Sequence, residues 1–284
     1  MFLRVGVSAS QYGVRQTPEP TNTIRLLLAY LRYLSRARDE HSLHSPFLFS
    51  LYTRIIRTDN RRDPTFTPIR TLREALRKNR EPVTITDFGA GSKVNTSRQR
   101  TIGDIARHSQ KPARFGRLLF RLVRHVRAST IVDLGTSLGI TTAYLAEAVC
   151  PHGGRVLTFE GCPQTAAVAR RNLEQLGVDN VTVVVGNIDE TLAPQMNALG
   201  PIDFAFFDAN HRYEPTIRYF EICLRNRHND TVFVFDDIHW SDEMEQAWAH
   251  IRQHSAVSVT VDLFWIGLVF FRQEQPKQDF VLRF

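Results

Sequence analysis

Hydrophobic and polar positions follow two alternating rhythms along the second half of the chain. Short apolar runs typical of buried strands are separated by longer segments whose apolar residues recur at helical spacing. The runs cover residues 130–134, 155–159, 181–185, 203–207 and 231–235. The helical segments cover about 140–149, 164–176, 189–198, 214–226 and 242–254. This alternation predicts an α/β fold with a doubly wound, Rossmann-like parallel sheet.

Both ends of this pattern have their own signals. Residues 115–127 form an amphipathic helix that leads into the first strand. After the last helix, the apolar runs 257–263 and 266–272 are joined by a short turn and predict a C-terminal antiparallel hairpin.

The first 110 residues predict a mainly helical region. Apolar residues at helical spacing predict helices over 23–36, 47–57 and 69–79, and two prolines indicate a loop at 58–69. Residues 1–20 look like a loose tail. We therefore expect an N-terminal helical cap over residues 1–110 and an α/β domain over residues 111–284.

Length and composition are typical of a globular protein with a sizeable core. The chain has 284 residues, of which 43% are hydrophobic, and no apolar run approaches the roughly 20 residues that span a bilayer. Charge interrupts the N-terminus too early for a signal peptide. The cysteines, Cys150, Cys162 and Cys223, show neither metal-ligand spacing nor a disulfide pattern. We expect a cytoplasmic protein without a transmembrane segment.

Charge divides unevenly between the two halves. Residues 1–130 hold 25 Lys and Arg against 9 Asp and Glu, whereas residues 131–284 hold 11 against 20. A basic half of this kind can bind nucleic acid or an anionic membrane, or it can dock as a solvated cap on the acidic domain. We favour the docked cap, because the first half lacks the interleaved aromatic platform that single strands need.

Residues 131–139 and Glu160 form the most specific pattern in the chain. The first segment, Ile-Val-Asp-Leu-Gly-Thr-Ser-Leu-Gly, runs a buried strand into a glycine turn and a helix. Gly135 and Gly139 have no Cβ, so a ligand can approach the backbone closely. Glu160 ends the next strand, where an acid can accept hydrogen bonds from both ribose hydroxyls. The pattern predicts a nucleoside site at the switch point of the sheet.

Residues 83–92 also run a strand into a glycine turn. The segment after them is polar and irregular, and no strand ending in an acid follows at the right interval. We expect residues 81–100 to form either a loop facing substrate or cofactor, or a simple turn.

The turn Gly-Thr-Ser-Leu-Gly favours S-adenosylmethionine over NAD as the nucleoside. It lacks the Gly-x-Gly-x-x-Gly pattern that a pyrophosphate requires. It resembles motif I of class I methyltransferases, and the resemblance continues at residues 186–189, 207–211 and 235–240. The resemblance implies that the cofactor is bound by Asp133, Gly135, Thr136, Ser137, Gly139, Glu160, Gly161, Asn187, Ile188 and Asp208.

Three acids end the fourth and fifth predicted strands, namely Asp208, Asp236 and Asp237. Carboxylates that converge at one sheet edge repel unless a cation or donor intervenes, and hard oxygen ligands suit Mg²⁺ or Ca²⁺. The spacing resembles catechol-type and caffeoyl-CoA-type O-methyltransferases, which hold Mg²⁺ with an Asp and an Asp-Asn pair. Asp237 stands in place of the Asn. The alternative is that these acids cap helices or bind cofactor amines.

His211 follows Asp208 by three residues, where the catechol-type families carry a basic lysine. The resemblance therefore makes His211 the candidate general base for an acceptor hydroxyl, with Asp208 as its catalytic neighbour, because histidine titrates near neutrality. A helix-start histidine without a role is the alternative. His239, beside Trp240, is a weaker second candidate.

The function expected is S-adenosylmethionine-dependent O-methylation of a small-molecule hydroxyl, with Mg²⁺ as a candidate second cofactor and a homodimer as the candidate assembly. The alternative is an RNA-directed methyltransferase, or a non-catalytic nucleoside-binding protein, that uses the basic N-terminal region. Methyltransferases that modify base nitrogens often carry an Asn/Asp-Pro-Pro-Tyr motif after the fourth strand. Asp208-Ala-Asn-His replaces it here, which favours a hydroxyl acceptor and makes a nucleic acid partner unlikely.

Overall fold

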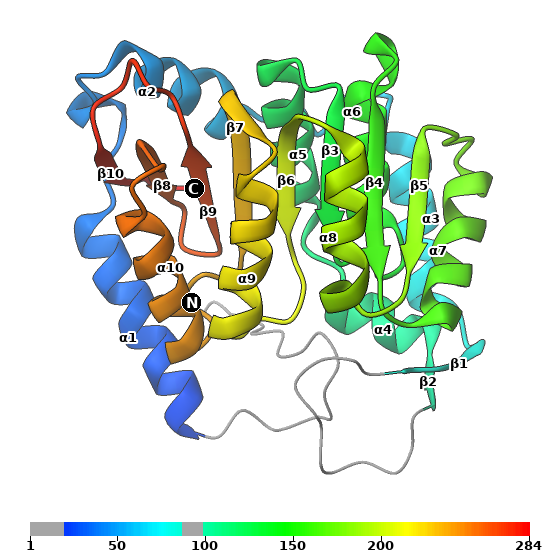
Figure 1. Ribbon diagram of the computed structural model, residues 1–284. Helices are drawn as coiled ribbons and strands as arrows, with labels where there is room; N and C mark the ends of the chain where they lie inside the picture. The colour runs from blue at the N-terminus through cyan, green and yellow to red at the C-terminus, as the bar shows by residue number, and fades with distance from the viewer. Residues whose placement is uncertain (1–19, 87–98) are drawn as a thin grey trace.

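A central eight-stranded sheet organises the computed structural model, which describes residues 20–86 and 99–284 (Figure 1). The strand order is β10-β8-β9-β7-β6-β3-β4-β5. The strands are β3 (Thr130–Leu134), β4 (Arg155–Glu160), β5 (Val181–Val185), β6 (Ile202–Phe207), β7 (Arg227–Asp236), β8 (Val259–Asp262), β9 (Ile266–Phe270) and β10 (Gln278–Val281). Only β9 runs antiparallel to its neighbours, β7 and β8. The C-terminal ends of all the other strands therefore lie at one edge of the sheet.

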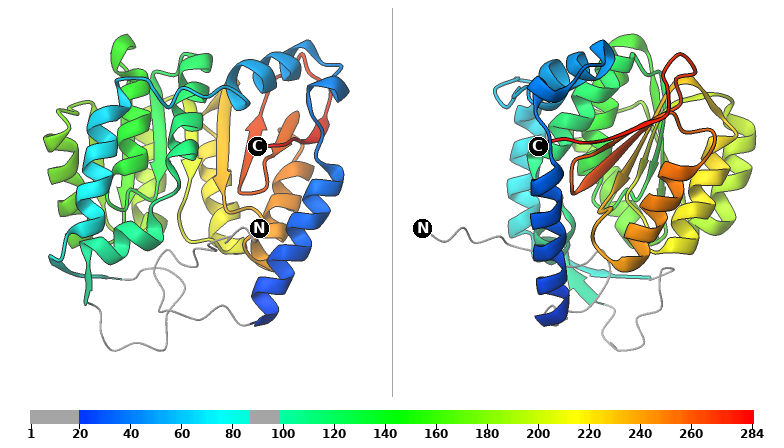
Figure 2. Two further views of the ribbon diagram at one scale, coloured as in Figure 1. Left: turned by 180° about the vertical axis from the view of Figure 1, so that it is seen from behind. Right: turned by 90° about the vertical axis from the view of Figure 1, so that its left-hand side faces the viewer.

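Helices cover both faces of this sheet (Figures 1 and 2). One face carries α5 (Ala113–Val126), α6 (Ile140–Val149) and α7 (Pro163–Gln175). The other carries α8 (Ile188–Leu199), α9 (Tyr213–Leu224) and α10 (Asp242–Gln253). The central strands are apolar on both sides because both faces are covered, and β9 is buried along its whole length.

The N-terminal region adds further elements to the outer layers. They are α1 (Pro20–Arg36), the short turn η1 (Glu40–Ser42), α2 (Pro46–Leu51), the π-helical turn η2 (Tyr52–Ile56), α3 (Phe66–Lys78), β1 (Pro82–Thr84), β2 (Gln99–Thr101) and α4 (Ile102–Ser109). Phe66 of α3 packs edge-on against Phe120 of α5, with ring centroids 4.9 Å apart. The apolar core thus runs continuously from the N-terminal helices into the sheet. The domain division at residue 110 stays a prediction.

Helix α1 lies along the edge of the molecule beside β10 and α10 (Figure 1). Its inner side buries Tyr33 and neighbours against Phe264, and the Tyr33 hydroxyl donates to the Leu282 carbonyl at 2.5 Å. A β-bridge joins Arg38 to Leu282, so residues far apart in the sequence are joined here. The outer side exposes an apolar stripe, Ile24, Leu27, Leu28, Leu31 and Leu34.

The α/β pattern predicted from the sequence is confirmed. The strands β3 and β5 occupy the predicted ranges, and the five helices after β3, β4, β5, β6 and β7 lie within two residues of theirs. The predicted hairpin forms as β8 and β9, but it is not the last element, because β10 follows and pairs parallel with β8. The sequence analysis also missed α4 and the π-helical turn that ends the second predicted helix.

Two segments singled out in the sequence fall partly or wholly beyond the described residues. The predicted tail at residues 1–19 and the glycine turn within 87–98 are both outside them. The flanks of the second segment, β1 and β2, pair antiparallel. Among the described helices, none has the length and apolar character that a membrane crossing requires.

Candidate active site

The candidate site lies where β3, β6 and β7 end side by side. The residues that directly follow or end these strands are Gly135, Asp208 and Asp236. Gly135 has φ +112°, and a Cβ placed there would lie 2.3 Å from the Asp208 carbonyl oxygen. Only glycine permits this approach, so the glycine turn and the first acid of the carboxylate cluster are in direct contact.

Glu160 anchors the glycine turn from the tip of β4. Its side chain is buried, and its two carboxylate oxygens accept from the backbone N–H groups of Ser137 at 2.8 Å and Cys162 at 2.9 Å. A carboxylate has about four lone-pair sites, so each oxygen can accept more than one hydrogen bond. The same bond holds Ser137 at φ 49°, a left-handed conformation that non-glycine residues rarely adopt.

Asp133 and Thr136 support the turn from inside the protein. One Asp133 carboxylate oxygen accepts from the hydroxyls of Thr142 at 2.6 Å and Thr158 at 2.8 Å, and Thr158 also contacts the Thr136 hydroxyl. Burial raises the pKa of Asp133 to about 6, although the two hydroxyls oppose the shift. Both side chains are buried, so any role they have in cofactor binding is to position backbone.

The expected adenine-side residues lie at the tip of β5, next to Glu160. The register pairs Glu160 with Val185, two residues before Asn187. Asn187 caps α8, and its side-chain oxygen accepts from the Asp189 N–H at 3.1 Å. Ile188 is buried beside it, and Gly161 follows Glu160 directly. The structure thus gathers the expected cofactor residues around the tips of β3, β4, β5 and β6.

The base of the 81–100 segment touches the same region. The Thr84 N–H donates to the Gln164 side-chain oxygen at 2.6 Å, and the Cys162 thiol lies 3.3 Å from the Thr84 carbonyl. Cys162 is two residues beyond Glu160. The described flank of this segment thus contacts the residues that follow Glu160, and both interpretations of residues 81–100 stay predictions.

Lys111 neutralises the acids at the ends of β6 and β7. Its ammonium pairs with Asp236 and lies 2.9 Å from a carboxylate oxygen of Asp237. Burial raises the pKa of Asp208 to about 7, although Lys111 opposes the shift. Burial and the neighbouring Asp208 raise the pKa of Asp236 as well. Burial disfavours the Lys111 charge, but Asp236, Asp237 and Asp208 more than compensate and raise its pKa, so it stays protonated.

The sequence analysis missed Lys111, which enters from the segment between α4 and α5. Its carbonyl accepts from the Arg73 guanidinium at 2.7 Å, which fixes the segment against α3. A signal was present in the composition. The chain has four lysines among its 36 basic residues, and a lysine in so arginine-rich a region is unusual.

His211 stands at the mouth of the carboxylate cluster. Its Nε2 atom lies 3.5 Å from a carboxylate oxygen of Asp208. Burial disfavours the imidazolium and lowers the pKa of His211 below its ordinary value, although Asp237 and Asp236 oppose the shift. The imidazole is therefore neutral near pH 7 and can accept a proton.

His239 is held in the opposite charge state. Its two ring nitrogens face Glu245 at 3.1 Å and Asp262 at 2.8 Å. Burial disfavours the charge, but these two carboxylates raise the pKa of His239 to about 9. Both ring nitrogens thus face carboxylates, and a protonated ring cannot accept a proton, which argues against His239 as the base.

Helix α1 fixes the loop that follows β7. The Arg25 guanidinium donates to the carbonyls of His239 at 3.0 Å and Trp240 at 2.5 Å, and it pairs with Asp242 at 3.1 Å. This contact was not expected from the sequence, because Arg25 lies more than 200 residues away along the chain.

Strained backbone gathers at this edge of the sheet. Left-handed φ values occur at Ser137, Asn210, Asp237 and Phe264, each in a turn that follows a strand tip. Such conformations cost of order 1–3 kcal/mol each and persist where the surroundings hold them in place. The edge is thus a set of rigid turns rather than of relaxed loops.

The carboxylate cluster fits a divalent cation. One donor atom each from Asp208, His211 and Asp236 lies within 4.8 Å of the others. The Oδ1 atoms of Asp208 and Asp236 are buried and have no hydrogen-bond partner within the described part of the chain. Buried oxygen donors of this kind suit Mg²⁺ or Ca²⁺. Lys111 supplies positive charge to the same acids.

Parts of the chain are similar in sequence to known methyltransferases. Residues 132–238 match the family model described as a methyltransferase domain. The chain is 38% identical over 127 residues to a catechol O-methyltransferase of Mycobacterium tuberculosis. The aligned residues cover 44% of this chain and 56% of that protein. It is 34% identical over 126 residues to a catechol O-methyltransferase of Niastella koreensis, covering 43% and 55%. The chain spans about half the length of these curated relatives.

Solved structures share the fold. An O-methyltransferase of Bacillus cereus in complex with S-adenosylhomocysteine has a TM-score of 0.53 at 21% identity, covering 78% of this chain and 96% of that one. A methyltransferase of Podospora anserina has a TM-score of 0.57 at 12% identity, covering 93% and 100%. Over residues 132–238 the chain is therefore similar to methyltransferase domains, and it shares its fold with these two methyltransferase structures.

Proposed function

We propose that this protein transfers a methyl group from S-adenosylmethionine to a hydroxyl of a small molecule. The observation that carries the proposal is the junction of two sites. The Gly135 turn touches the Asp208 backbone, and Asp208 in turn gathers His211 and Asp236 within reach of one bound group. The relatives named catechol O-methyltransferase support a hydroxyl acceptor. They give no support to the RNA-directed or non-catalytic alternative.

The cofactor would be held around Glu160. Its carboxylate would accept the ribose hydroxyls, while Asn187 and Ile188 would lie beside the adenine. Gly135 and Gly139, with positive φ values, leave room for close approach of the ligand to the backbone. S-adenosylmethionine, when bound, supplies an electrophilic methyl group.

His211 would act as the general base. Its neutral imidazole would take the proton of the acceptor hydroxyl, leaving an oxygen nucleophile at the mouth of the cofactor crevice. Asp208, 3.5 Å from the ring, would stabilise the imidazolium that results. The rigid turns at Asn210 and Asp237 would keep these groups in place.

A divalent cation would be held by Asp208 and Asp236, with Asp237 in support. When bound there, a metal lowers the pKa of an acceptor hydroxyl and orients it. The residues also bring their own cation, Lys111, to Asp236 and Asp237. The acids therefore concentrate positive charge where the acceptor oxygen would become negative.

The N-terminal region would complete the acceptor site as a cap. Arg25 of α1 donates hydrogen bonds to the loop after β7, and the end of β1 contacts Cys162. We further propose a homodimer, supported by the exposed apolar stripe of α1, because contiguous apolar surface of this kind is uncommon on monomers.

The first experiment screens catechols, phenols and sugars with S-adenosylmethionine and measures the S-adenosylhomocysteine formed. With an acceptor in hand, His211→Gln should lower the turnover rate by roughly 10²–10⁴-fold while leaving cofactor affinity unchanged. The matched control is His152→Gln, an exposed histidine beyond the site, which should keep full activity. A His211→Gln enzyme that works at the normal rate would remove the general-base role.

A further inference from the structure

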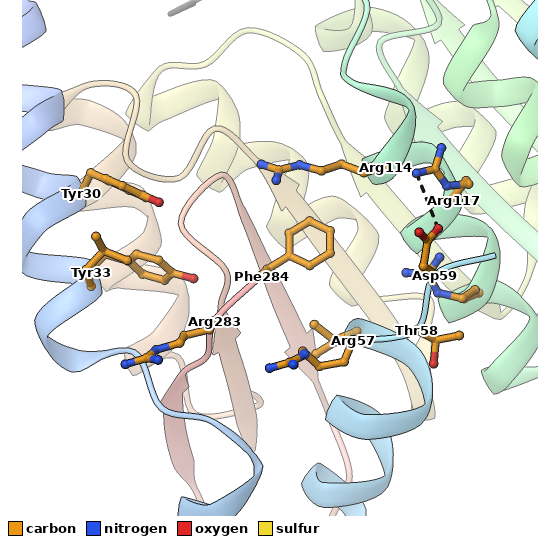
Figure 3. Close-up of a pocket in the computed structure, with 12 residues that line it drawn as sticks. Tyr30, Tyr33, Arg57, Thr58, Asp59, Arg114, Arg117, Arg283 and Phe284 are labelled. Atoms are coloured by element: carbon orange, nitrogen blue, oxygen red, sulfur yellow. Dashed lines mark ion pairs between the residues drawn. The ribbon is translucent and has the colours of Figure 1, made fainter. Parts of the chain in front are cut away.

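A basic hollow lies on one face of the molecule between α1, η2 and the start of α5 (Figure 3). The last residues of the chain, Arg283 and Phe284, form its centre. Its volume is about 490 Å³, within the range of small-molecule sites. The carboxylate cluster contributes no residue to the lining.

Positive charge dominates the lining. Five arginines face a single acid, Asp59. The arginines are Arg57, Arg114, Arg117, Arg121 and Arg283. Asp59 is largely committed to Arg61, whose Nε lies 2.5 Å from it, and it approaches Arg117 only at 4.0 Å. The hollow therefore carries a clear excess of positive charge.

Three of these guanidinium groups make no ion pair with a carboxylate within residues 20–86 and 99–284. Arg114 lies over the rings of Phe115 and Phe284, at 4.9 and 5.3 Å from their centroids. The Arg283 backbone N–H donates to the Arg38 carbonyl at 3.1 Å. Figure 3 shows the Arg114 side chain extending from α5 toward α1, across the hollow. These cations are positioned but not neutralised.

Arg121 is the third, and it is buried at the base of α5. Its guanidinium donates to the Ile55 carbonyl at 2.8 Å and to the Asn60 side-chain oxygen at 2.6 Å, both uncharged acceptors. Burial and the nearby Arg117 lower the pKa of Arg121 to about 10. A buried charge with neutral partners and a like-charged neighbour would gain stability from a bound anion.

The remaining walls are aromatic. Tyr30 and Tyr33 of α1 face Phe284 across the hollow (Figure 3). Leu34 of the same helix also lines it. Planar guanidinium groups match phosphate oxygens in pairs, and aromatic rings offer apolar surface to the rest of a ligand. The lining thus combines a phosphate-binding half with an apolar half.

We propose that this hollow is a binding site for a phosphate-bearing ligand with at least two negative charges. The shared chemistry is a phosphate group on an organic body, either as a free phosphate ester or as the headgroup of an anionic phospholipid. The site is independent of the proposed methyl transfer, because none of the residues assigned to that reaction lines it.

The test measures binding to the full-length protein at constant ionic strength. Calorimetry with pyrophosphate and with adenosine monophosphate probes the free source. Sedimentation with vesicles of phosphatidylcholine, with and without phosphatidic acid, probes the lipid source. The variant Arg114→Gln/Arg283→Gln removes two exposed arginines that have no ion-pair partner among the described residues. The control Lys78→Gln/Arg80→Gln removes the same charge from exposed positions outside the hollow.

We expect at least tenfold weaker binding of one probe by the Arg114→Gln/Arg283→Gln protein and unchanged binding by the control. Loss confined to the calorimetry assigns a free phosphate ester, and loss confined to the phosphatidic acid vesicles assigns a lipid headgroup. Absence of binding to every probe would overturn the proposal. Equal weakening in the variant and the control would also overturn it, because it would reflect net charge alone. Thermal unfolding of both proteins confirms that they are folded.

Discussion

At the residue scale, the balance of charge around Lys111 dominates the candidate site. Asp208, Asp236 and Asp237 lie close together at the strand ends, and the Lys111 ammonium pairs with Asp236 and Asp237. Removing one partner of a buried charge group is more harmful than removing all of them, because the remaining charges are left uncompensated. The fold therefore depends on either Lys111 or another cation at this position.

Replacing Lys111 with methionine should destabilise the protein by roughly 3–5 kcal/mol at neutral pH, because Asp236 and Asp237 lose their counter-charge. Mg²⁺ should restore much of this loss if the acids can hold a metal, and EDTA should reverse the rescue. Thermal unfolding with and without Mg²⁺ measures both effects.

In the wild type, EDTA should abolish turnover and added Mg²⁺ should restore it. A variant indifferent to Mg²⁺, together with full wild-type activity in EDTA, would show that Lys111 alone serves the acids.

Glu160→Gln should weaken S-adenosylmethionine binding at least tenfold. Hydrogen bonds to a charged group contribute roughly 1.5–3 kcal/mol each, and the neutral amide loses that charge assistance. Calorimetry measures the affinity, and Glu174→Gln on α7 is the matched control. Unchanged affinity in a folded Glu160→Gln protein would refute the ribose-binding role.

His239 should make stability depend on pH. The folded protein holds its proton up to a pKa of about 9, whereas an unfolded histidine releases it near 6.5. The contribution is therefore full below pH 6.5 and is lost as pH rises through 9, a difference of roughly 3 kcal/mol. The unfolding free energy of His239→Gln should lack this decline, whereas that of His152→Gln should keep it. Parallel curves for all three proteins would contradict the assignment.

At the element scale, the close contact between the ends of β3 and β6 limits which residue the turn can hold at position 135. Gly135→Ala places a Cβ 2.3 Å from the Asp208 carbonyl oxygen, so the two strand tips must separate. Gly177→Ala is the matched control, because it shares a positive φ but meets nothing within 4 Å. We expect the control to lose about 1 kcal/mol of stability. Gly135→Ala should lose clearly more, together with cofactor affinity. Equal losses in thermal unfolding would show that backbone strain alone matters.

The elements that the sequence predicted well are those whose own residues determine them. Strands such as β5 and helices such as α6 are continuous patterns bounded by glycine or polar turns, so they can be recognised locally. By contrast, β10 is a half-exposed edge strand that exists because β8 offers it a partner. The π-helical turn η2 likewise depends on packing against α5 rather than on its own pattern.

The candidate site divides in the same way. Glu160, Asp208 and Asp236 could be predicted because parallel strands deliver their tips to one edge. Lys111 and Arg25 could not, because each reaches the site from a segment whose docking depends on tertiary contacts. Asp133 and Thr136 were expected near the cofactor, and their internal hydrogen bonds became visible only in three dimensions.

At the scale of the whole molecule, the basic residues of the first half fall into two groups. Part of the basic half docks on acids of the second half, as Arg25 does on Asp242 and Lys111 on Asp236. Another part, including Arg114 and Arg121, lines the basic hollow without a carboxylate partner in the described chain. The docked cap expected from the sequence therefore describes the first group of basic residues, and binding of an anionic partner by the second stays a prediction.

The bridge between Arg38 and Leu282 has a consequence for biosynthesis. Helix α1 is synthesised well before its partners, the loop after β7 and the strand β10, which lie more than 200 residues later in the chain. Domains fold during synthesis as their parts become available, and contacts of such sequence separation form late. The inner apolar side of α1, which carries Tyr33, therefore stays uncovered until these partners have been synthesised. Chaperone dependence should concentrate on this helix, and moving it to the C-terminus by circular permutation should shorten the wait.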